Sequence, residues 1–284
     1  MLKYILLHNI GSLETLMSVY GLKCFEESSR LFYLVSSAGR VKYGKPIFSL
    51  IIPVFNEANI ICENLRVIDD FLRRASLPYE IIVCDDCSSD GTYRKVNSLL
   101  MEKPNILLIR FNRRLGKGGT IKRAIDLASG EVVVFMDVDL SVDLSYVVKF
   151  VNTLMAGSPI VIGERSISDR FTQGFFRVFL SLAYNVLVNL LFRTGIRDHQ
   201  CGFKGFRVDV AKLLVDKVFS NDFVFDTELI VKARSLGIPI KVVQIRWCEK
   251  RLDGGRNLRW VKAAFIMMRD LFIMKLKTRN VSVV

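Results

Sequence analysis

Two aspartates two positions apart are the residues of this 284-residue chain with the most direct chemical meaning. Asp137 and Asp139 directly follow the apolar run 131–136, which predicts a buried strand that ends at these carboxylates. Two carboxylates at this spacing can bind one divalent cation, while substrate phosphates and water complete its octahedral oxygen shell. Taken alone, Asp-x-Asp is common by chance, and two exposed acids in a turn are the simpler interpretation.

The neighbouring sequence favours the metal site over that simpler interpretation. The predicted strand 48–55 is followed by Glu57, and the predicted strand 80–84 is followed by Asp85 and Asp86. In a parallel sheet, ligands bind beyond the carboxyl ends of the strands, so these acids are expected near Asp137 and Asp139. Carboxylates gathered at one edge of a basic protein would repel each other, which implies a bound cation.

The spacing of apolar residues predicts the elements that carry these side chains. Helices are expected over 59–75, 92–102, 121–128 and 144–155, and further strands over 105–109 and 159–163. Strands alternating with helices predict an α/β fold with a mainly parallel sheet and helices on both of its faces. We expect a catalytic domain over 46–255, preceded by an N-terminal extension, 1–45, which carries no chemical motif. Residues 256–284 are expected to form a C-terminal helix.

Other kinds of site are disfavoured by the sequence. The glycine-rich run 116–119 does not match the phosphate loop of nucleotide hydrolases, and no Gly-x-Gly-x-x-Gly follows a predicted strand. Cys84 and Cys87 form a Cys-x-x-Cys pair, but no second pair follows and the chain has only two histidines. Two ordinary cysteines are therefore favoured over a zinc or redox site, and six cysteines fit a reducing compartment.

The chain is strongly basic, with a formal net charge of +13. Residues 241–284 contain eleven lysines and arginines against three acids, so more than half of the excess lies there. Such a surplus predicts an anionic partner, which could be nucleic acid, phospholipid or a phosphorylated substrate. A basic binding protein for nucleic acid or for an anionic membrane is therefore the non-enzyme alternative, and the acidic strand ends count against it.

Two segments predict contact with a membrane surface. Segment 171–193 is apolar except for a few positions, but Asn185 and Asn189 favour an interfacial or protein-covered helix over a transmembrane span. The helix expected over 258–277 has an apolar stripe among basic residues and contains Trp260, as do helices that bind anionic membranes. The alternative is a helix packed on the catalytic domain with its basic face in solvent.

Four motifs occur in an order that resembles a known family. They are SLIIPVFNE, EIIVCDDCSSDGT, NRRLGKGGTIKRAIDLASGEVVVFMDVDL and DHQCGFKGF. In this order they resemble the family 2 glycosyltransferases, which have the GT-A fold, and among them the polyprenyl-phosphate sugar transferases. The later motif FDTEL and a Trp-x-Glu before the basic helix are similar to dolichyl-phosphate glucosyltransferases, with the mannosyltransferases close behind. The resemblance covers residues 47–275.

The resemblance implies a role for each matching position at the donor end. It implies that the nucleotide of a nucleotide sugar, with UDP-glucose favoured over GDP-mannose, is contacted by Pro53, Phe55, Glu57, Asp86 and Lys117. It also implies that Asp137 and Asp139 bind Mg²⁺ or Mn²⁺ together with the diphosphate. Phe55 stands where relatives often have tyrosine, so a hydroxyl contact is missing there. Cys87 stands where glycine is frequent.

For the acceptor, the resemblance implies a polyprenyl or dolichyl phosphate at the cytoplasmic face of a membrane, and no nucleic acid. Arg165 and Arg170 match basic positions that hold the acceptor phosphate, and two guanidinium groups suit that task. Asp198 and Asp226 are expected to position groups or to act as a base. The expected reaction is an inverting displacement at the anomeric carbon. A family 2 transferase acting on a saccharide hydroxyl, which needs a true base, is the enzyme alternative.

Overall fold

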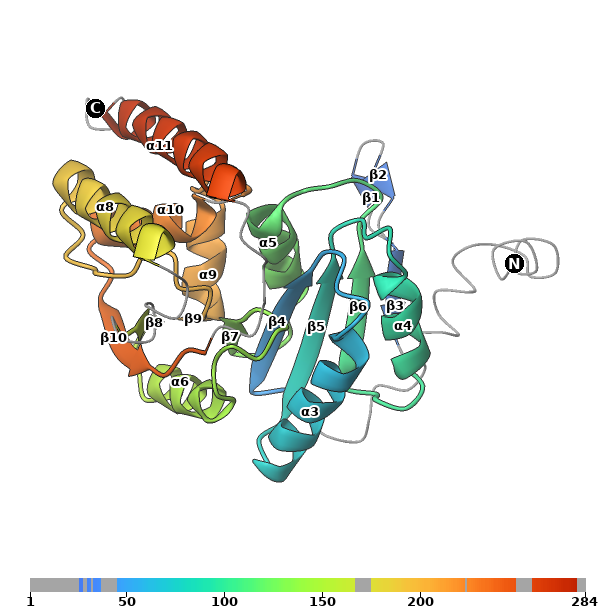
Figure 1. Cartoon of the computed structure of the whole chain (residues 1–284). Helices are drawn as coiled ribbons and strands as arrows, with labels where there is room; N and C mark the ends of the chain where they lie inside the picture. The colour runs from blue at the N-terminus through green and yellow to red at the C-terminus, as the bar shows by residue number, and fades with distance from the viewer. Residues whose placement is uncertain are drawn as a thin grey trace.

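The computed structural model describes residues 26–27, 30–31, 33–36, 45–166, 175–222, 224–248 and 257–279. Its centre is an eight-stranded sheet in the order β10-β8-β9-β7-β4-β5-β6-β3 (Figure 1). In that order the strands are Ile240–Ile245, Ile160–Arg165, Lys204–Arg207, Val132–Phe135, Phe48–Val54, Tyr79–Asp85, Ile106–Arg110 and Tyr33–Ser36. Two short strands, β1 (Glu26–Glu27) and β2 (Arg30–Leu31), pair with each other outside this sheet.

The sheet is mainly parallel, as predicted. Strand β4 runs parallel to β5 and β7, β5 runs parallel to β6, and β8 runs parallel to β10. The register pairs Leu50 of β4 with Ile81 of β5 and with Val134 of β7, so the carboxyl ends of these strands share one edge. Strand β9 is antiparallel to both neighbours, and β3, from the N-terminal 45 residues, adds an antiparallel edge strand beside β6.

Helices cover both faces of the sheet, as predicted. The helices are α3 (Ile61–Arg74), α4 (Thr92–Leu99), α5 (Lys117–Leu127), α6 (Ser145–Met155), α9 (Val208–Val215) and α10 (Phe225–Ser235). Side chains alternate along β4, so Leu50 and Ile52 pack with α3, α4 and α6, whereas Ile51 packs with α5, α9 and α10. Both faces are therefore buried, which explains the nearly continuous apolar runs of the strands.

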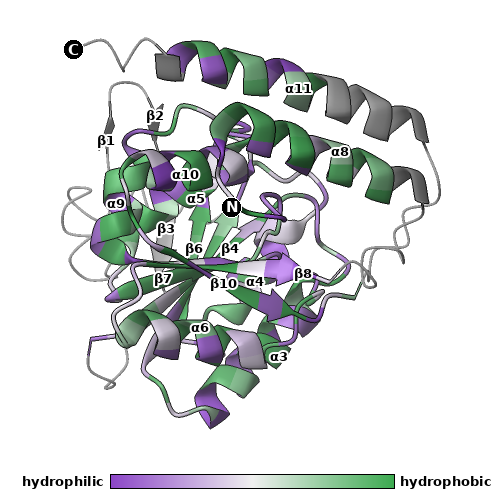
Figure 2. Cartoon of the chain, turned by 90° about the vertical axis from the view of Figure 1, so that its left-hand side faces the viewer, coloured by the Kyte–Doolittle hydropathy of each residue, from purple (hydrophilic) through white to green (hydrophobic). Residues whose placement is uncertain are grey.

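Helices α8 (Phe175–Phe192) and α11 (Asn257–Arg279) form an additional layer. Figure 2 shows them side by side, on the far side of α10 from the sheet. A separate apolar cluster joins them, in which Tyr184 and Val188 of α8 meet Leu271 and Met274 of α11, together with Val231 of α10. The described end of α11 is thus packed on the domain, as the docked alternative expects, while its first side chains lie outside the described residues.

Both helices also keep apolar side chains on their outer surface. On α8 these are Phe179, Leu182, Val186 and Leu190, spaced three or four residues apart, and on α11 they are Met268, Phe272, Ile273 and Leu276. One stripe on each helix therefore packs inward while another faces outward. Within the described part of the chain, no helix combines the length and hydropathy that a transmembrane span requires.

Candidate active site

The loops after β4 and β5 are tied to each other by side chains that accept hydrogen bonds from backbone amides. The amide of Asn56 donates to the Ser88 hydroxyl and that of Glu57 to the Thr92 hydroxyl, each at 2.9 Å. In return, the Asn56 side chain accepts from the amide of Ser89 at 2.9 Å. Asn56 has a φ of 56°, a left-handed conformation that asparagine tolerates better than most residues. These bonds fix the loop that carries Phe55 and Glu57.

Asp86 is buried at the end of β5 and its carboxylate is engaged by the loop before α5. One oxygen accepts from the amide of Leu115 at 2.6 Å, and the other accepts from the amide of Gly116 at 3.1 Å and from Arg114 Nε at 2.9 Å. The Arg114 guanidinium carbon lies 3.3 Å from the ring centroid of Phe55. Sequence reasoning missed Arg114, which joins two of the predicted nucleotide contacts although it is only three residues from Lys117.

Asp137 and Lys117 form an ion pair at the same edge. Lys117 Nζ lies 2.7 Å from Asp137 Oδ1, and the two side chains keep 31% and 46% of their surface exposed. Burial acts to lower the pKa of Lys117, but the negative charges of Asp137 and Asp226 outweigh it and raise the pKa above its usual value. Lys117 is therefore a permanent cation beside the predicted metal ligand.

Gly202 closes the site behind this pair. A Cβ at position 202 would lie 2.6 Å from Asp137 Oδ2 and 2.8 Å from Lys117 Nζ, far inside van der Waals contact. Any other residue at this position would have to displace one of the two charged groups. The loop that carries Gly202 runs from α8 to β9. It therefore brings the residues that follow α8 next to the predicted metal site.

A second ion pair lies deeper, under the first. Lys204 begins β9, is fully buried, and its Nζ lies 2.6 Å from Asp226 Oδ1. The same ammonium donates to the carbonyls of His199 and Cys201. Since Asp226 also acts on Lys117, the charges alternate from Asp137 through Lys117 and Asp226 to Lys204. In this arrangement Asp226 compensates the positive charges of Lys117 and Lys204.

The donor set at Asp137 and Asp139 fits a hard divalent cation that shares its ligands with a substrate. Asp139 accepts the amide of Ser141 at 3.0 Å through one oxygen. Among the residues the structure describes, no group of three or more metal-ligating side chains is present. Mg²⁺ is commonly held by one or two carboxylates plus substrate phosphates, so two aspartates suffice only if a diphosphate completes the shell.

Arg165 and Asp198, predicted to act separately, are joined in the structure. Nε and one Nη of Arg165 lie 2.8 and 2.9 Å from the two carboxylate oxygens of Asp198, a side-on bidentate pair. Asp198 is fully buried and the Arg165 side chain keeps only 12% of its surface exposed. Burial acts to lower the pKa of Arg165, while the bond to Asp198 raises it, so the guanidinium stays charged.

The loop that carries Asp198 is anchored on α8 by two asparagines. Asn185 accepts from both the amide and Nδ1 of His199, at 3.0 and 2.7 Å. Asn189 donates to the carbonyl of Ile196 at 2.7 Å and accepts from the amide of Gly195 at 2.9 Å. Burial, assisted by the charge of Lys204, lowers the pKa of His199 to about 4, so its imidazole is neutral. These asparagines explain why α8 is not wholly apolar.

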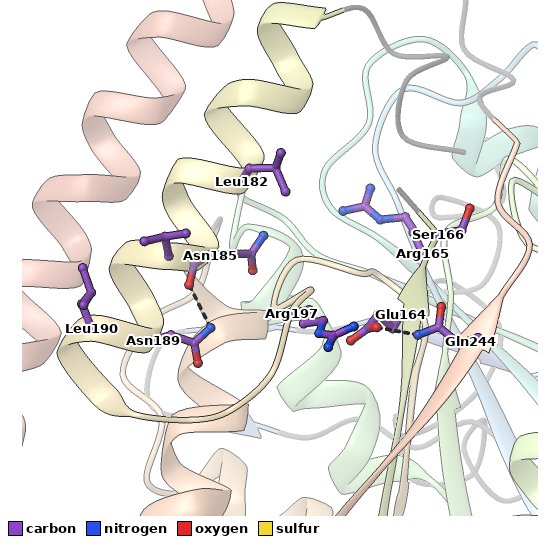
Figure 3. Close-up of a pocket in the computed structure, with 10 residues that line it drawn as sticks. Glu164, Arg165, Ser166, Leu182, Asn185, Asn189, Leu190, Arg197 and Gln244 are labelled. Carbon is purple, nitrogen blue, oxygen red and sulfur yellow. Dashed lines mark hydrogen bonds between the residues drawn. The ribbon is translucent and has the colours of Figure 1, made fainter. Parts of the chain in front are cut away.

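A cavity of about 820 Å³ lies between α8 and the end of β8 (Figure 3). Arg165 and Arg197 line it, as do Leu182 and Val186 of α8. In Figure 3, Arg197 lies between the helix on one side and the strand that carries Glu164 on the other. The cavity therefore combines cationic groups with an apolar wall. Sequence reasoning missed Arg197, although it precedes Asp198 directly.

The structure brings most of the predicted site residues together and leaves their roles as predictions. Those at the shared edge of β4, β5 and β7 are Pro53, Phe55, Glu57, Asp86, Lys117, Asp137 and Asp139. Arg165 and Asp198 form one pair at the end of β8, and Asp226 lies beneath Lys117. Glu228 is buried and accepts the amides of Phe219 and Ser220, so it supports a loop. Arg170 lies outside the described residues.

Similarity to solved structures gives the class of this fold. The chain resembles glucosyl-3-phosphoglycerate synthase from Mycobacterium tuberculosis, solved with Mn²⁺, UDP and glucosyl-3-phosphoglycerate, with a TM-score of 0.61 and 20% identity over 82% of this chain and 80% of that one. A mannosyltransferase from Pyrobaculum calidifontis, solved with GDP-Man and Mn²⁺, gives a TM-score of 0.50 and 21% identity over 74% and 59% of the chains. The fold is therefore GT-A, as predicted.

The sequence then gives the family. Residues 49–214 match Glycosyl transferase family 2, and the chain belongs to this family. It is 34% identical over 207 residues to the glycosyltransferase AglD of Haloferax volcanii, covering 71% of this chain and 33% of AglD. It is 32% identical over 223 residues to the dolichyl-phosphate β-glucosyltransferase of Dictyostelium discoideum, covering 73% of this chain and 68% of that protein. The chain thus spans a third of the first relative and about two thirds of the second.

Proposed function

We propose that this glycosyltransferase moves glucose from UDP-glucose to a polyprenyl phosphate of the dolichyl type, with inversion at the anomeric carbon. The relatives from Dictyostelium and from Drosophila melanogaster, the latter 32% identical over 248 residues, are both named dolichyl-phosphate β-glucosyltransferase. The single observation that carries the choice of a lipid acceptor is the outward apolar stripe of α8 beside a cavity lined by arginines. A soluble sugar acceptor would have no use for that stripe.

The donor is proposed to bind at the edge formed by β4, β5 and β7. The Phe55 loop and Asp86 face the nucleotide, and Asp137 with Asp139 would hold Mg²⁺ or Mn²⁺ together with the diphosphate. Such a cation stabilises the negative charge of the leaving diphosphate. Lys117 stays protonated beside Asp137 and adds a second positive charge at the same place.

The acceptor needs orientation more than activation. A phosphate monoester is already mostly dianionic at neutral pH, so no side chain has to remove a proton from the attacking oxygen. This accounts for a site in which Asp198 and Asp226 are paired with Arg165 and Lys204 instead of poised as bases. GDP-mannose is the alternative donor, which the experiment below separates from UDP-glucose. A saccharide hydroxyl is the alternative acceptor, and it would need a true base.

We propose that the protein works on the cytoplasmic face of a membrane, with α8 and α11 against the lipid surface. Their outward apolar residues and the basic C-terminal segment together suit an interfacial helix pair on an anionic membrane. The nucleotide sugar would then arrive from solvent while the acceptor arrives from the membrane.

One assay tests donor, acceptor and metal together. Purified protein is incubated with radiolabelled UDP-glucose, UDP-N-acetylglucosamine or GDP-mannose, with or without a polyprenyl phosphate, and with Mg²⁺, Mn²⁺ or a chelator. We expect label in the organic phase only with UDP-glucose, the lipid and a metal. Transfer from GDP-mannose alone would overturn the choice of sugar. Absence of lipid-soluble product with every donor would overturn the proposed function.

A further inference from the structure

The residue that binds the acceptor phosphate can be sought among the cations of the cavity beside β8. Arg165 lines this cavity, but Nε and one Nη of its guanidinium already bind Asp198, which is fully buried. Moving Arg165 to a ligand would break both of these charge-assisted bonds to a buried carboxylate, which is strongly unfavourable. Arg165 is therefore better suited to shaping the site than to capturing a phosphate alone.

Arg197 is better placed to bind a phosphate. It lines the same cavity, is exposed, and has no hydrogen-bond or ion-pair partner among the residues that the structure describes. A guanidinium in this state loses no existing bond when it binds an anion. Its five donors in a planar fork match two oxygens of a phosphate at once.

The backbone that presents Arg197 is fixed on both sides. The carbonyl of Ile196 accepts from Asn189, and the amide of His199 donates to Asn185, so α8 holds the chain before and after Arg197. Asp198 is held by Arg165 in addition. A side chain mounted on such a loop loses little further backbone freedom when a ligand binds, which favours affinity.

The remaining wall of the cavity suits a hydrocarbon chain. Leu182, Val186 and Leu190, three of the four residues of the outward stripe of α8, line it and keep 38%, 59% and 74% of their surface exposed, so the stripe itself forms the apolar wall of the cavity. Glu164 also lines the cavity, where its carboxylate accepts from Gln244 at 2.5 Å. This acid would repel further negative charge, which favours a ligand with one phosphate over a lipid diphosphate.

We propose that Arg197 binds the phosphate of the polyprenyl phosphate acceptor and that the cavity beside it holds the first isoprene units. This inference rests on the proposed function and names a residue for its acceptor side. Arg197 acts as a binding residue for the lipid substrate, and Arg165 with Asp198 keeps its loop in place.

The test compares Arg197→Ala and Arg197→Lys with wild type in detergent micelles that contain no phospholipid. Loss of a charge-assisted hydrogen bond should raise the KM for polyprenyl phosphate roughly tenfold or more. The lysine variant should fall between wild type and alanine, because it keeps the charge and loses the fork. The KM for UDP-glucose and the calorimetric affinity for UDP should not change.

Arg193→Ala is the matched control, since Arg193 is exposed, lies four residues away and does not line the cavity. An equal rise of KM in Arg193→Ala and Arg197→Ala would overturn the inference, as would a change in the KM for UDP-glucose. An effect that appears only on vesicles with anionic phospholipid would assign Arg197 to a membrane headgroup instead. If wild type transfers no sugar to the lipid, the proposed function fails; if wild type does and Arg197→Ala matches it, only this inference fails.

Discussion

At the ends of β4, β5 and β7 the site consists of short loops tied by backbone amides, whereas the segment from the end of α8 to Lys204 of β9 is held by buried ion pairs and by α8. On the first side, which we call the donor side, Asp86 accepts two amides and Asp137 keeps 46% of its surface exposed. On the second, the acceptor side, Asp198 and Lys204 are fully buried. The donor side keeps its Asp137–Lys117 pair partly exposed to solvent, while the acceptor side buries its ion pairs.

This difference follows from what each side is proposed to bind. A nucleotide diphosphate brings several negative charges and a cation, so its site needs exposed charged groups that become neutralised on binding. A lipid phosphate brings one charged group and a long apolar chain, so its site needs one well-placed cation and an apolar wall. Charges beyond that one would only add desolvation cost, and pairing them inside the protein removes that cost.

The largest expected effect comes from breaking the acceptor-side ion pair beneath the site. Lys204→Met leaves Asp226 partly buried without its partner and frees two carbonyls, so the free energy of unfolding should fall by about 3–5 kcal/mol. Denaturant unfolding measures this, with exposed Lys212→Met as the control that should change little. The double variant Lys204→Met with Asp226→Leu should recover more than half of the loss. No recovery would mean that the carbonyl bonds, not the ion pair, dominate.

On the donor side, Asp137→Asn should leave stability near wild type and reduce turnover. A metal at a leaving diphosphate is worth several kcal/mol, so kcat should fall by about 100-fold or more. Initial rates across a Mn²⁺ titration measure this. Asp143→Asn is the control, because Asp143 follows the same strand, is exposed, and accepts the amide of Ser145 at the start of α6. Activity of Asp137→Asn within threefold of wild type would remove Asp137 from the metal site.

Buried His199 in the acceptor-side loop should give the protein a stability that falls as the pH drops from 6.5 to 4. His199 has a pKa of about 4 in the fold, because burial and Lys204 disfavour its charged form, against an ordinary value of 6.5. The unfolded chain therefore takes up this proton between pH 6.5 and 4 and the folded chain does not. Stability is unaffected above about pH 6.5 and falls below it, by about 2 kcal/mol between pH 7.5 and pH 5.

Unfolding free energies of wild type and His199→Gln at these two pH values measure the effect. The glutamine variant should lose about 2 kcal/mol less than wild type over the interval, because it has no imidazole to titrate. Equal losses would show that other groups set the acid sensitivity.

The smallest effect is expected where the two sides touch. In Gly202→Ala the new methyl group would meet the ends of two side chains, Asp137 and Lys117, which can rotate away without moving the backbone. Stability should therefore change little, while kcat falls about tenfold because the ion pair opens and misplaces the metal ligand. Steady-state kinetics measure the change in kcat, and thermal unfolding of the same variant measures the change in stability. A large loss of stability with normal kcat would contradict this account.

The sequence predicted more of the donor side than of the acceptor side. The strands β4, β5, β6, β7 and β8 and the meeting of Asp86, Asp137 and Asp139 at one edge were predictable, because apolar runs that end in acids are local patterns and parallel strands bring their ends together. Lys117 was expected there only from the family resemblance. The strand β9 was not, because Lys204 and Gly205 carry no strand pattern and only pairing with two neighbours makes it a strand.

The acceptor side was least predictable because its meaning lies in pairs distant in sequence. Arg165 lies 33 residues from Asp198, and Lys204 lies 22 residues from Asp226. From sequence, each of these residues reads as a separate ligand or base, whereas the fold shows that they neutralise each other. Likewise, Asn185 and Asn189 suggested an interfacial helix from sequence, whereas in the structure they bind His199 and Ile196 of the loop after α8.

The loop from Arg197 to Lys204 has a consequence for how this enzyme can diverge. Within eight residues, this loop makes five different contacts. Arg197 lines the cavity, Asp198 binds Arg165, and Gln200 contacts Met267 of α11. Gly202 leaves room for Asp137, and Lys204 pairs with Asp226. A single replacement here disturbs several neighbours at once. Descendants that acquire a new acceptor should therefore exchange this loop and α8 as one block, while the strand ends proposed to bind the donor vary one residue at a time.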